Sequence, residues 1–350
     1  MANPETSLSV EERLSARLRA LYESWGYRPW KASRFEEYEL YMRNKRFLTD
    51  ERILTFTDTD GKLMALRPDV TLSVVKNARE EDLPLRICYT ESVFRAPRNG
   101  DGFREIMQTG IEVIGFSSSW SCCEALLLAA KSLCIIRPNG WQLDVSDMGI
   151  IADILEGEML AANVRTRILA AIRGKSLHGL KETCEDNGVS DKTTELLSAL
   201  VEISGRFPEA LAALTALPLP EPSQKKVLAL REIGEAADAL NLSHICLDFS
   251  VVNDMSYYNG LIFSGFVQGV PTPVLSGGRY DPLLSRLGKR GHAVGFAVYL
   301  DQAVRSEKGS RKVQETIYIP TKGRRAPEIA RDMEAIAATG KRAAAEEAET

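Results

Sequence analysis

Alternating polar and hydrophobic positions predict two neighbouring antiparallel strands around residue 100. The segments are residues 88–97 and 104–115, separated by a turn rich in Pro, Asn and Gly. In each segment polar side chains share one face, where Arg95 of the first strand would join Gln108 and Glu112 of the second. The pattern leaves two interpretations open, namely the floor of a polar pocket or a solvated sheet face with a cross-strand Arg–Glu pair.

Helical spacing of apolar residues predicts a first helix close to the N-terminus. It begins with a capping box, Ser9-Val-Glu-Glu12, and ends near Gly26. The elements expected next are a strand and Asp-Gly turn at 54–61, a return strand at 63–66, a helix at 72–78, a helix at 124–136 and a strand at 141–145.

The character of the sequence changes between residues 157 and 242. Aromatic residues almost disappear there, Leu and Ala recur at helical spacing, and a proline-rich stretch at 217–222 interrupts the run. We expect an all-helical insertion at 157–242. Strands are expected again at 245–252 and 261–267, followed by a Gly-Gly-Arg-Tyr-Asp segment and a helix that begins near Val294.

Strands in hairpin-like pairs, interrupted by helices, predict an antiparallel α+β fold. We expect its core to consist of residues 1–156 and 243–310, on either side of the helical insertion. The last part, 311–350, is expected to be short, with a strand at 316–319, a helix at 326–338 and a frayed tail from residue 343.

The composition is that of a soluble globular protein, with 44% hydrophobic and 26% charged residues and a formal net charge of -4. No apolar run could span a membrane and no signal peptide is visible, so we expect a cytoplasmic protein. The net charge gives no general attraction to nucleic acid. Six cysteines without C-x-x-C spacing and three isolated histidines predict reduced thiols, and neither a metal site nor a cofactor.

Five short segments follow one another along the chain: Leu66-Arg-Pro-Asp-Val-Thr71, Phe94-Arg95 with Gln108 and Glu112, Ser256-Tyr-Tyr-Asn259, Gly277-Gly-Arg-Tyr-Asp281 and Gly295-Phe-Ala297. In this order they resemble the catalytic core of histidyl-tRNA synthetase, a class II aminoacyl-tRNA synthetase. There they are similar to an Arg-Pro-Glu-Gly-Thr segment, motif 2, the histidine-specific signature, the approach to motif 3 and motif 3 itself. The resemblance covers roughly residues 8–302 outside the insertion. It implies a class II antiparallel sheet flanked by helices.

The resemblance also implies a histidine-binding pocket, made of Asp69, Thr71, Arg95, Gln108, Glu112, Tyr258 and Tyr280. In this interpretation Asp69 and Glu112 hold the α-ammonium group of histidine, helped by Thr71 and Gln108. Asp69 departs from the family pattern, because the synthetase has a Glu at this position, one methylene longer.

The remaining side chains of the implied pocket contact the other two groups of histidine. Arg95 would pair with the carboxylate, and Tyr258 and Tyr280 would line the imidazole site. Two neighbours in the same motifs, Tyr257 and Arg279, are expected to be structural, since tyrosines in strands usually pack in the core.

Three positions depart from the synthetase in a way that bears on catalysis. Asn253 and Gln302 stand where the synthetase motifs carry arginine, and Gly102 lies in a shortened motif 2 loop where a further arginine is expected. Asn and Gln donate hydrogen bonds but supply no positive charge to ATP phosphates. Losing one such group typically costs about 3–4 kcal/mol of barrier, so we expect little adenylate chemistry.

The C-terminal part is shorter than the anticodon domain of the synthetase family. The chain therefore resembles the regulatory subunits of ATP phosphoribosyltransferase, a glycosyltransferase complex. The resemblance implies a non-catalytic subunit that activates the short-form catalytic subunit and makes the first step of histidine biosynthesis responsive to histidine. It further implies self-association to at least a dimer, through the region around residues 47–56 and the strands after it, and no binding of tRNA.

Two alternative functions remain. A truncated histidyl-tRNA synthetase would require cations at positions 253 and 302, where the sequence has none. A tRNA-binding or signalling module could retain the fold without the amino acid pocket. The pocket pattern argues against this second alternative, because Arg95, Gln108, Glu112 and Tyr258 all fit it.

Overall fold

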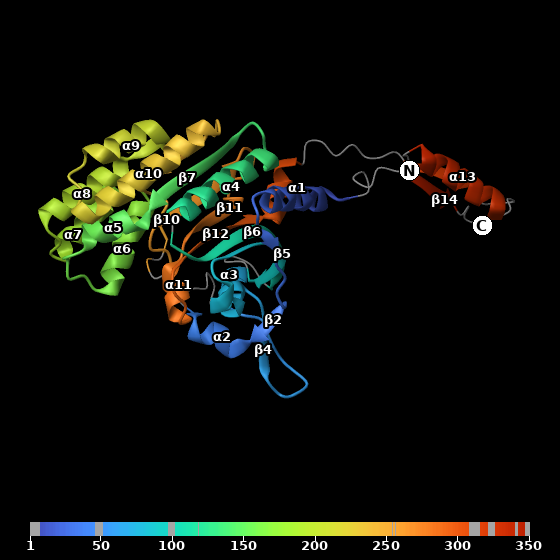
Figure 1. Cartoon of the computed structure of the whole chain (residues 1–350), viewed down its shortest axis with the longest axis horizontal. Helices are drawn as coiled ribbons and strands as arrows, with labels where there is room; N and C mark the ends of the chain where they lie inside the picture. Colours follow the sequence, from blue (N-terminus) through green and yellow to red (C-terminus); the bar gives the residue numbers. More distant parts are fainter. Residues whose placement is uncertain are drawn as a thin grey trace. The chain divides into compact units, whose positions relative to one another are not determined.

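The computed structural model of the chain divides into two compact units, Ser15–Ser306 and a second unit of Met1–Leu14 with Glu307–Thr350 (Figure 1). Helix α1 (Val10–Ser24) begins in the second unit and continues into the first. The structure describes residues 8–45, 52–96, 102–117, 119–253, 255, 257–307, 316–320, 326–339 and 342–346.

The larger unit is built on a nine-stranded sheet in the order β1-β5-β6-β12-β11-β10-β7-β9-β8. The strands are β1 (Arg28–Pro29), β5 (Leu85–Arg95), β6 (Arg104–Phe116), β7 (Trp141–Asp147), β8 (Ser204–Arg206), β9 (Ile245–Asp248), β10 (Leu261–Val267), β11 (Leu275–Arg279) and β12 (His292–Tyr299). All pairs from β5 through β7 are antiparallel, whereas β1 pairs in parallel with β5 and β9 with β7. The predicted antiparallel α+β fold is confirmed.

One face of this sheet is apolar and is covered by helices α1 and α4 (Trp120–Ile136). Phe263 of β10 and Phe296 of β12 lie there with ring centroids 6.2 Å apart, and Tyr22 of α1 meets Phe296 at 5.8 Å. The Tyr22 hydroxyl also lies 3.0 Å from Ser132 Oγ of α4. In Figure 1 both helices lie along the same side of the sheet.

The opposite face carries Gln108 and Glu112 of β6. Glu112 lies opposite Gly295 of β12, which lies opposite Gly278 of β11. Because successive residues of a strand point to opposite faces, these three positions face away from Phe296 and from α4. Helices α3 (Val70–Asn77) and α11 (Asp281–Arg286) pack on this side, around a core that includes Val70 and Leu283.

A small three-stranded sheet, in the order β2-β4-β3, lies next to α3. Its strands are antiparallel and are β2 (Phe35–Glu37), β4 (Leu63–Leu66) and β3 (Thr55–Thr57), with helix α2 (Tyr38–Arg43) following β2. Figure 1 shows α2, α3, α11 and this sheet on the side of the large sheet away from α1 and α4.

The region between residues 157 and 242 consists mainly of helices. After α5 (Met148–Leu155) it contains α6 (Ala162–Arg173), α7 (Leu177–Asp186), α8 (Asp191–Glu202), α9 (Phe207–Ala216) and α10 (Glu221–Ala239). It also holds β8, which pairs antiparallel with β9, so the region is not all-helical as expected. The three residues of β8, Ser-Gly-Arg, are too few to show strand alternation. The expected bounds of the insertion, 157–242, and of the core, 1–156 and 243–310, stay predictions.

The helix expected from Val294 is wrong. The residues form β12, a central strand between β6 and β11, and only Leu300–Ala303 forms a short helix, α12. A strand that is buried on both faces reads as a continuous apolar run, and periodicity cannot distinguish such a run from a buried helix.

The smaller unit contains a strand–helix–strand arrangement of β13 (Thr316–Pro320), α13 (Ala326–Ala338) and β14 (Arg342–Glu346). The strand and the helix were predicted, but the tail expected to fray instead begins with β14, which pairs in parallel with β13. Alanine-rich residues have low strand propensity, so pairing with β13 decides this strand and local preference does not.

The N-terminal helix has the reciprocal bonds of the predicted capping box. The Ser9 amide donates to Glu12 Oε2 at 2.7 Å, and the Glu12 amide donates to Ser9 Oγ at 3.1 Å. Two short 3₁₀ helices, Glu80–Asp82 and Val304–Glu307, complete the described elements.

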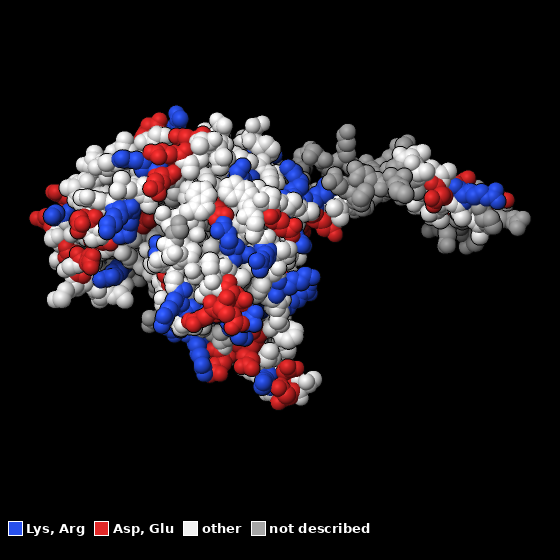
Figure 2. Space-filling view, viewed as in Figure 1, with Lys and Arg blue, Asp and Glu red and all other residues white. Residues whose placement is uncertain are grey.

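Acidic and basic side chains are interspersed on the face of the molecule drawn in Figure 2, including the surface of the helices α6–α10. Within the described residues, none of the helices combines the length and the apolar character needed to cross a membrane.

Candidate functional site

The carboxylate of Glu112 is the centre of the candidate site. Thr71 Oγ1, in the first turn of α3, donates a hydrogen bond to Glu112 Oε1 at 2.7 Å. Tyr280 Oη, directly after β11, donates to Oε2 at 2.5 Å. The structure thus brings together three predicted pocket residues from three separate segments, around a carboxylate that is only 1% exposed.

Glycines on the neighbouring strands make room for these side chains. An ideal Cβ at Gly295 would lie 1.8 Å from Glu112 Oε2, and one at Gly278 would lie 2.8 Å from two ring carbons of Tyr258. Any larger residue would therefore displace the Glu112 carboxylate or the Tyr258 ring. The sequence patterns mark both glycines as part of motifs but give no reason for them; the packing supplies it.

Asp69 and Arg95 form a second polar pair at the site. Asp69 caps α3, where its Oδ1 accepts from the Leu72 amide at 2.9 Å, and its Oδ2 lies 3.6 Å from Arg95 Nη2. Arg95 Nε donates to the Pro68 carbonyl at 2.7 Å. Burial raises the pKa of Asp69, and the charge of Arg95 opposes that rise.

Burial also raises the pKa of Glu112, to about 8, against an ordinary value of 4.5. The hydrogen bonds from Tyr280 and Thr71 favour the ionised carboxylate, whereas the negative charge of Asp69 disfavours it. Two carboxyl groups in one desolvated site therefore gain strongly from a bound cation, which would lower the pKa of both.

Three tyrosines form the aromatic side of the site. The ring centroid of Tyr257 lies 4.5 Å from that of Tyr258 and 6.3 Å from that of Tyr280. Burial raises the pKa of all three hydroxyls. Tyr257, expected to be structural, lies between the two predicted pocket tyrosines, and its position in the Tyr-Tyr doublet was the only signal for it in the sequence.

Gln108 is buried on β6, one turn of the alternation beyond Gly110 from Glu112 and on the same face of the sheet. It lies opposite Glu91 of β5. Glu91 Oε2 pairs with Arg67 Nη2 at 2.8 Å, so the ion pair on this face joins β5 to the Asp69 segment and is not the cross-strand pair considered above.

Arg67 is a residue to which the sequence patterns assign no role. Its side chain is fully buried, and besides Glu91 it donates to the carbonyls of Ser92 and Ser33 at 2.9 Å each. A buried arginine of this kind fixes the segments it joins, because breaking its ion pair would leave an uncompensated charge. Arg67 therefore positions the segment that carries Asp69 and Thr71.

A polar network holds the turn that presents Tyr280. Asp281 Oδ2 accepts from Asn259 Nδ2 at 3.0 Å and from Arg279 Nε at 2.8 Å, and Oδ1 accepts from the Ala293 amide at 3.0 Å. Burial raises the pKa of Asp281, but the hydrogen bonds from Arg279 and Asn259 outweigh it and bring the pKa below its ordinary value. Arg279 thus acts on the turn and not on Glu112.

The positions that depart from the synthetase pattern carry no positive charge in the structure either. Asn253 is exposed, and Gln302 of α12 accepts from Thr272 Oγ1 at 3.3 Å and donates to Asp301 Oδ2 at 2.8 Å. Gly102 has a φ of 79°, a left-handed conformation in which a side chain is strained. An arginine at position 102 would therefore fit this backbone poorly.

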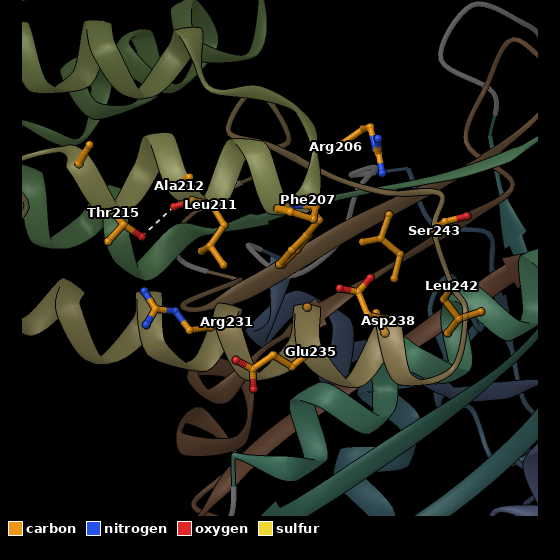
Figure 3. A pocket seen from close by; sticks show the side chains of 15 residues that line it. Arg206, Phe207, Leu211, Ala212, Thr215, Arg231, Glu235, Asp238, Leu242 and Ser243 are labelled. Atoms are coloured by element: carbon orange, nitrogen blue, oxygen red, sulfur yellow. Dashed lines mark hydrogen bonds between the residues drawn. The ribbon is translucent and has the colours of Figure 1, made fainter.

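Two cavities lie elsewhere in the larger unit, and neither is lined by the seven predicted pocket residues. One, of about 590 Å³, lies between α9 and α10, where Phe207 and Leu211 face Arg231 and Glu235 (Figure 3). The other, of about 430 Å³, lies between α10 and the start of α4. In the described part of the chain, no group of three or more His, Cys, Asp or Glu side chains could hold a metal ion.

Comparison with known proteins gives relatives over most of the chain. The ATP phosphoribosyltransferase regulatory subunit of Acetivibrio thermocellus is 27% identical over 300 residues, which are 84% of this chain and 72% of the relative. The regulatory subunit of the same name from Alkaliphilus metalliredigens is 28% identical over 306 residues, 85% of this chain and 77% of the relative.

Solved structures share the fold. A Bacillus halodurans protein described as an ATP phosphoribosyltransferase regulatory subunit/histidyl-tRNA synthetase has a TM-score of 0.80 and 22% identity, covering 96% of this chain and 88% of its own. A chain of the ATP phosphoribosyl transferase complex of Thermotoga maritima has a TM-score of 0.65 and 17% identity, covering 83% and 97%. The model of the histidyl-tRNA synthetase family matches residues 3–303, and the chain therefore belongs to that family.

Proposed function

We propose that this chain is the regulatory subunit of ATP phosphoribosyltransferase and has no catalytic activity of its own. The observation that carries the proposal is the pair of curated relatives, which bear this name and match 84% and 85% of the chain. The likeness to a chain of the Thermotoga maritima complex supports it, since that chain has the same fold and occurs in an assembly named ATP phosphoribosyl transferase.

The absence of cations at three positions favours this function over that of a histidyl-tRNA synthetase. Amino acid activation spreads negative charge over ATP phosphates and requires fixed positive groups. Position 253 holds Asn, position 302 holds Gln and position 102 holds Gly in a left-handed conformation. The alternative function is that of a truncated synthetase, and an assay of amino acid activation by the isolated chain distinguishes the two.

Histidine is the effector we propose for the site around Glu112. Its α-ammonium group would lie between Glu112 and Asp69, where two desolvated carboxyl groups gain from a positive charge. Thr71 and Tyr280 hold the Glu112 carboxylate in place through their hydrogen bonds, and Gln108 adds a buried amide on the same face.

The other two groups of histidine have matching partners in the same site. Arg95 lies beside Asp69 and supplies a guanidinium group for the carboxylate. Tyr258 and Tyr280 supply aromatic surface and hydroxyl groups for the imidazole, and Tyr257 packs against both rings.

In the cell we expect this chain to assemble with the short-form catalytic subunit in the cytoplasm. The assembled enzyme is a glycosyltransferase that performs the first step of histidine biosynthesis. The regulatory chain would be required for its full activity and would make it responsive to histidine. We expect the regulatory chain itself to be at least a dimer and to have no role in binding tRNA.

Co-purification with the short-form catalytic subunit tests this function directly. We expect the two chains to elute together, the activity to rise when both are present, and histidine to inhibit the complex. Two matched analogues test the pocket: histidine methyl ester lacks the carboxylate charge, and imidazole propionate lacks the ammonium group. Each should inhibit more weakly than histidine by roughly tenfold or more.

The result that would overturn the proposal is a catalytic subunit whose activity is unchanged by this chain. If assembly and activation occur but histidine has no effect, the regulatory role stands and the effector site is wrong. Histidine-dependent exchange between ATP and pyrophosphate by the isolated chain would instead support the synthetase.

A further inference from the structure

The cavity of about 430 Å³ lies on the face of the sheet opposite Glu112. It is enclosed by the first turn of α4, one side of α10, the C-terminal ends of β7 and β11, and the loop before β10. Leu261 and Asp147, which line the cavity, are paired across β10 and β7 and lie on the same face of the sheet as Phe263. The cavity is therefore on the face opposite Glu112. The volume of the cavity lies in the range of small-molecule sites, about 300–1,000 Å³.

The lining of this cavity combines an apolar wall with charges of both signs. Leu230 and Ile233 of α10 are buried in the wall, and Trp120 of α4 lies at its edge with half of its surface exposed. The charged side chains that line it are Lys225, Lys226, Arg279, Asp147 and Glu232. The N-cap residue of α4, Ser119, makes no side-chain capping bond, so the first turn of that helix also offers a positive dipole end.

Most of these charged groups are held in place by the fold. Lys226 Nζ pairs with Asp153 Oδ2 at 2.5 Å, and Arg279 pairs with Asp281 at 2.8 Å. Asp147 is only 9% exposed and its Oδ1 accepts from the Gly149 amide at 2.8 Å. A desolvated carboxyl group and fixed cations around one apolar cavity are the arrangement expected of a preorganised binding site.

We propose that this cavity binds a small zwitterion, an amino acid with an apolar side chain. The lining shows both signs of charge, and a ligand that carries both complements it better than an anion or a cation alone. The carboxylate of the ligand matches the α4 N-terminus with Lys225 and Arg279, the ammonium group matches Asp147 with Glu232, and the apolar side chain matches the apolar wall.

The cavity is also connected to the site on the other face of the sheet. Arg279 and Asn259 line the cavity, and both donate to Asp281. Tyr280, which lies between Arg279 and Asp281 in the chain, donates to Glu112 on the opposite face. Arg279 and Asn259 therefore line the cavity and also hold the turn that carries Tyr280.

Calorimetric titration of the full-length chain with three matched probes tests the proposal. L-Phenylalanine carries both charges, 3-phenylpropionate only the negative one, and phenethylamine only the positive one. We expect L-phenylalanine to bind at least about tenfold more tightly than either analogue, because each analogue lacks one charge-assisted contact. Equal affinity of L-phenylalanine and either analogue, or binding by none of the three, would overturn the proposal.

Two substitutions place the binding in this cavity. Lys225→Ala, at an exposed position of α10, should weaken L-phenylalanine by about tenfold, and Ala229→Trp should fill the cavity and abolish binding. The matched control is Ala212→Trp, which makes the same change in the cavity between α9 and α10 and should leave binding unchanged. Glu112→Gln separates this site from the histidine pocket, because it should weaken the binding of histidine but not the binding of L-phenylalanine. Unchanged binding in Lys225→Ala would place the probe elsewhere.

Discussion

At the scale of single residues, the Glu112 carboxylate is the group on which the proposed histidine pocket depends. It accepts hydrogen bonds from Thr71 and Tyr280, lies over Gly295 and is almost completely buried. Each of these contacts uses a different segment of the chain. A change at Glu112 should therefore report on the pocket more directly than a change at any one of its partners.

Replacing this carboxylate by an amide tests its role in histidine feedback. Glu112→Gln preserves the shape of the side chain but removes the charge opposite the ammonium group, a contact worth about 1.5–3 kcal/mol. The histidine concentration that inhibits the complex should rise by roughly ten- to a hundredfold, while activation of the catalytic subunit is retained. Glu105→Gln, at an exposed position of the same strand, is the control. Inhibition curves that coincide for the wild type and Glu112→Gln would move the effector site elsewhere.

The raised pKa of Glu112 predicts how stability depends on pH. The folded protein holds this proton up to a pH of about 8, whereas in the unfolded chain it is lost near 4.5. Raising the pH between these values therefore favours the unfolded state, and the wild type should lose stability relative to Glu112→Gln over this window. Thermal unfolding of both proteins between pH 5 and pH 8.5, in the absence of histidine, measures the difference. A difference that does not change with pH would contradict the prediction.

At the scale of elements, the pairing of β6, β12 and β11 builds the floor of the pocket. Glu112, Gly295 and Gly278 follow one another across these three strands. Two adjacent glycines leave a depression on an otherwise continuous sheet, and the Glu112 carboxylate and the Tyr258 ring occupy it. The shape of the site therefore depends on register between strands that are far apart in the sequence.

Gly295→Ala tests this arrangement. The added methyl group would meet Glu112 Oε2 and, at 2.5 Å, the Ile111 carbonyl, and the backbone oxygen cannot move away. Overpacking of this kind typically costs about 1–3 kcal/mol, so the urea midpoint should fall and histidine binding should weaken. Ser276→Ala, on β11 and on the same face of the sheet as Gly295, provides a comparison. In this variant the urea midpoint and the affinity for histidine should stay nearly unchanged. A variant as stable as the wild type would mean that the strands can shift more than we expect.

At the scale of the whole molecule, the fold is that of a synthetase core, while the groups needed for adenylate formation differ. Position 253 holds Asn and position 302 holds Gln, whose side chain is engaged with Thr272 and Asp301. We expect the isolated chain to make no histidyl-adenylate. Histidine-dependent exchange of pyrophosphate into ATP measures this, with an active histidyl-tRNA synthetase as the positive control. Exchange at a rate comparable to that of the control would contradict the prediction.

Self-association is the second prediction at this scale. Phe35 and Phe56 on the small sheet are 45% and 36% exposed, with ring centroids 5.6 Å apart. Phe56 belongs to the region predicted to pair, 47–56, of which residues 47–51 lie outside the described residues. Exposed aromatic pairs of this kind favour an interface between copies of the chain. We expect a dimer or larger by light scattering at micromolar concentration, and a shift towards monomer for Phe56→Glu. Leu228→Glu, an exposed leucine of α10, should leave the mass unchanged.

Local patterns in the sequence were sufficient for the elements whose signals are themselves local. The capping box of α1 needs only residues three positions apart, and the alternation in β5 and β6 already assigns Arg95, Gln108 and Glu112 to one face. The order of the motifs was sufficient for the family, because it depends on residue identity along the chain and not on contacts.

Only the tertiary structure decided which distant groups meet. Glu112 and Tyr280 are 168 residues apart, and their hydrogen bond exists because β12 lies between β6 and β11. The same strand was expected to begin a helix, since burial on both faces removes the alternation that marks a strand. Glu91 likewise pairs with Arg67 and not with an arginine on the facing strand, because the segment that carries Asp69 packs on β5. Packing between distant segments leaves no local pattern in a sequence.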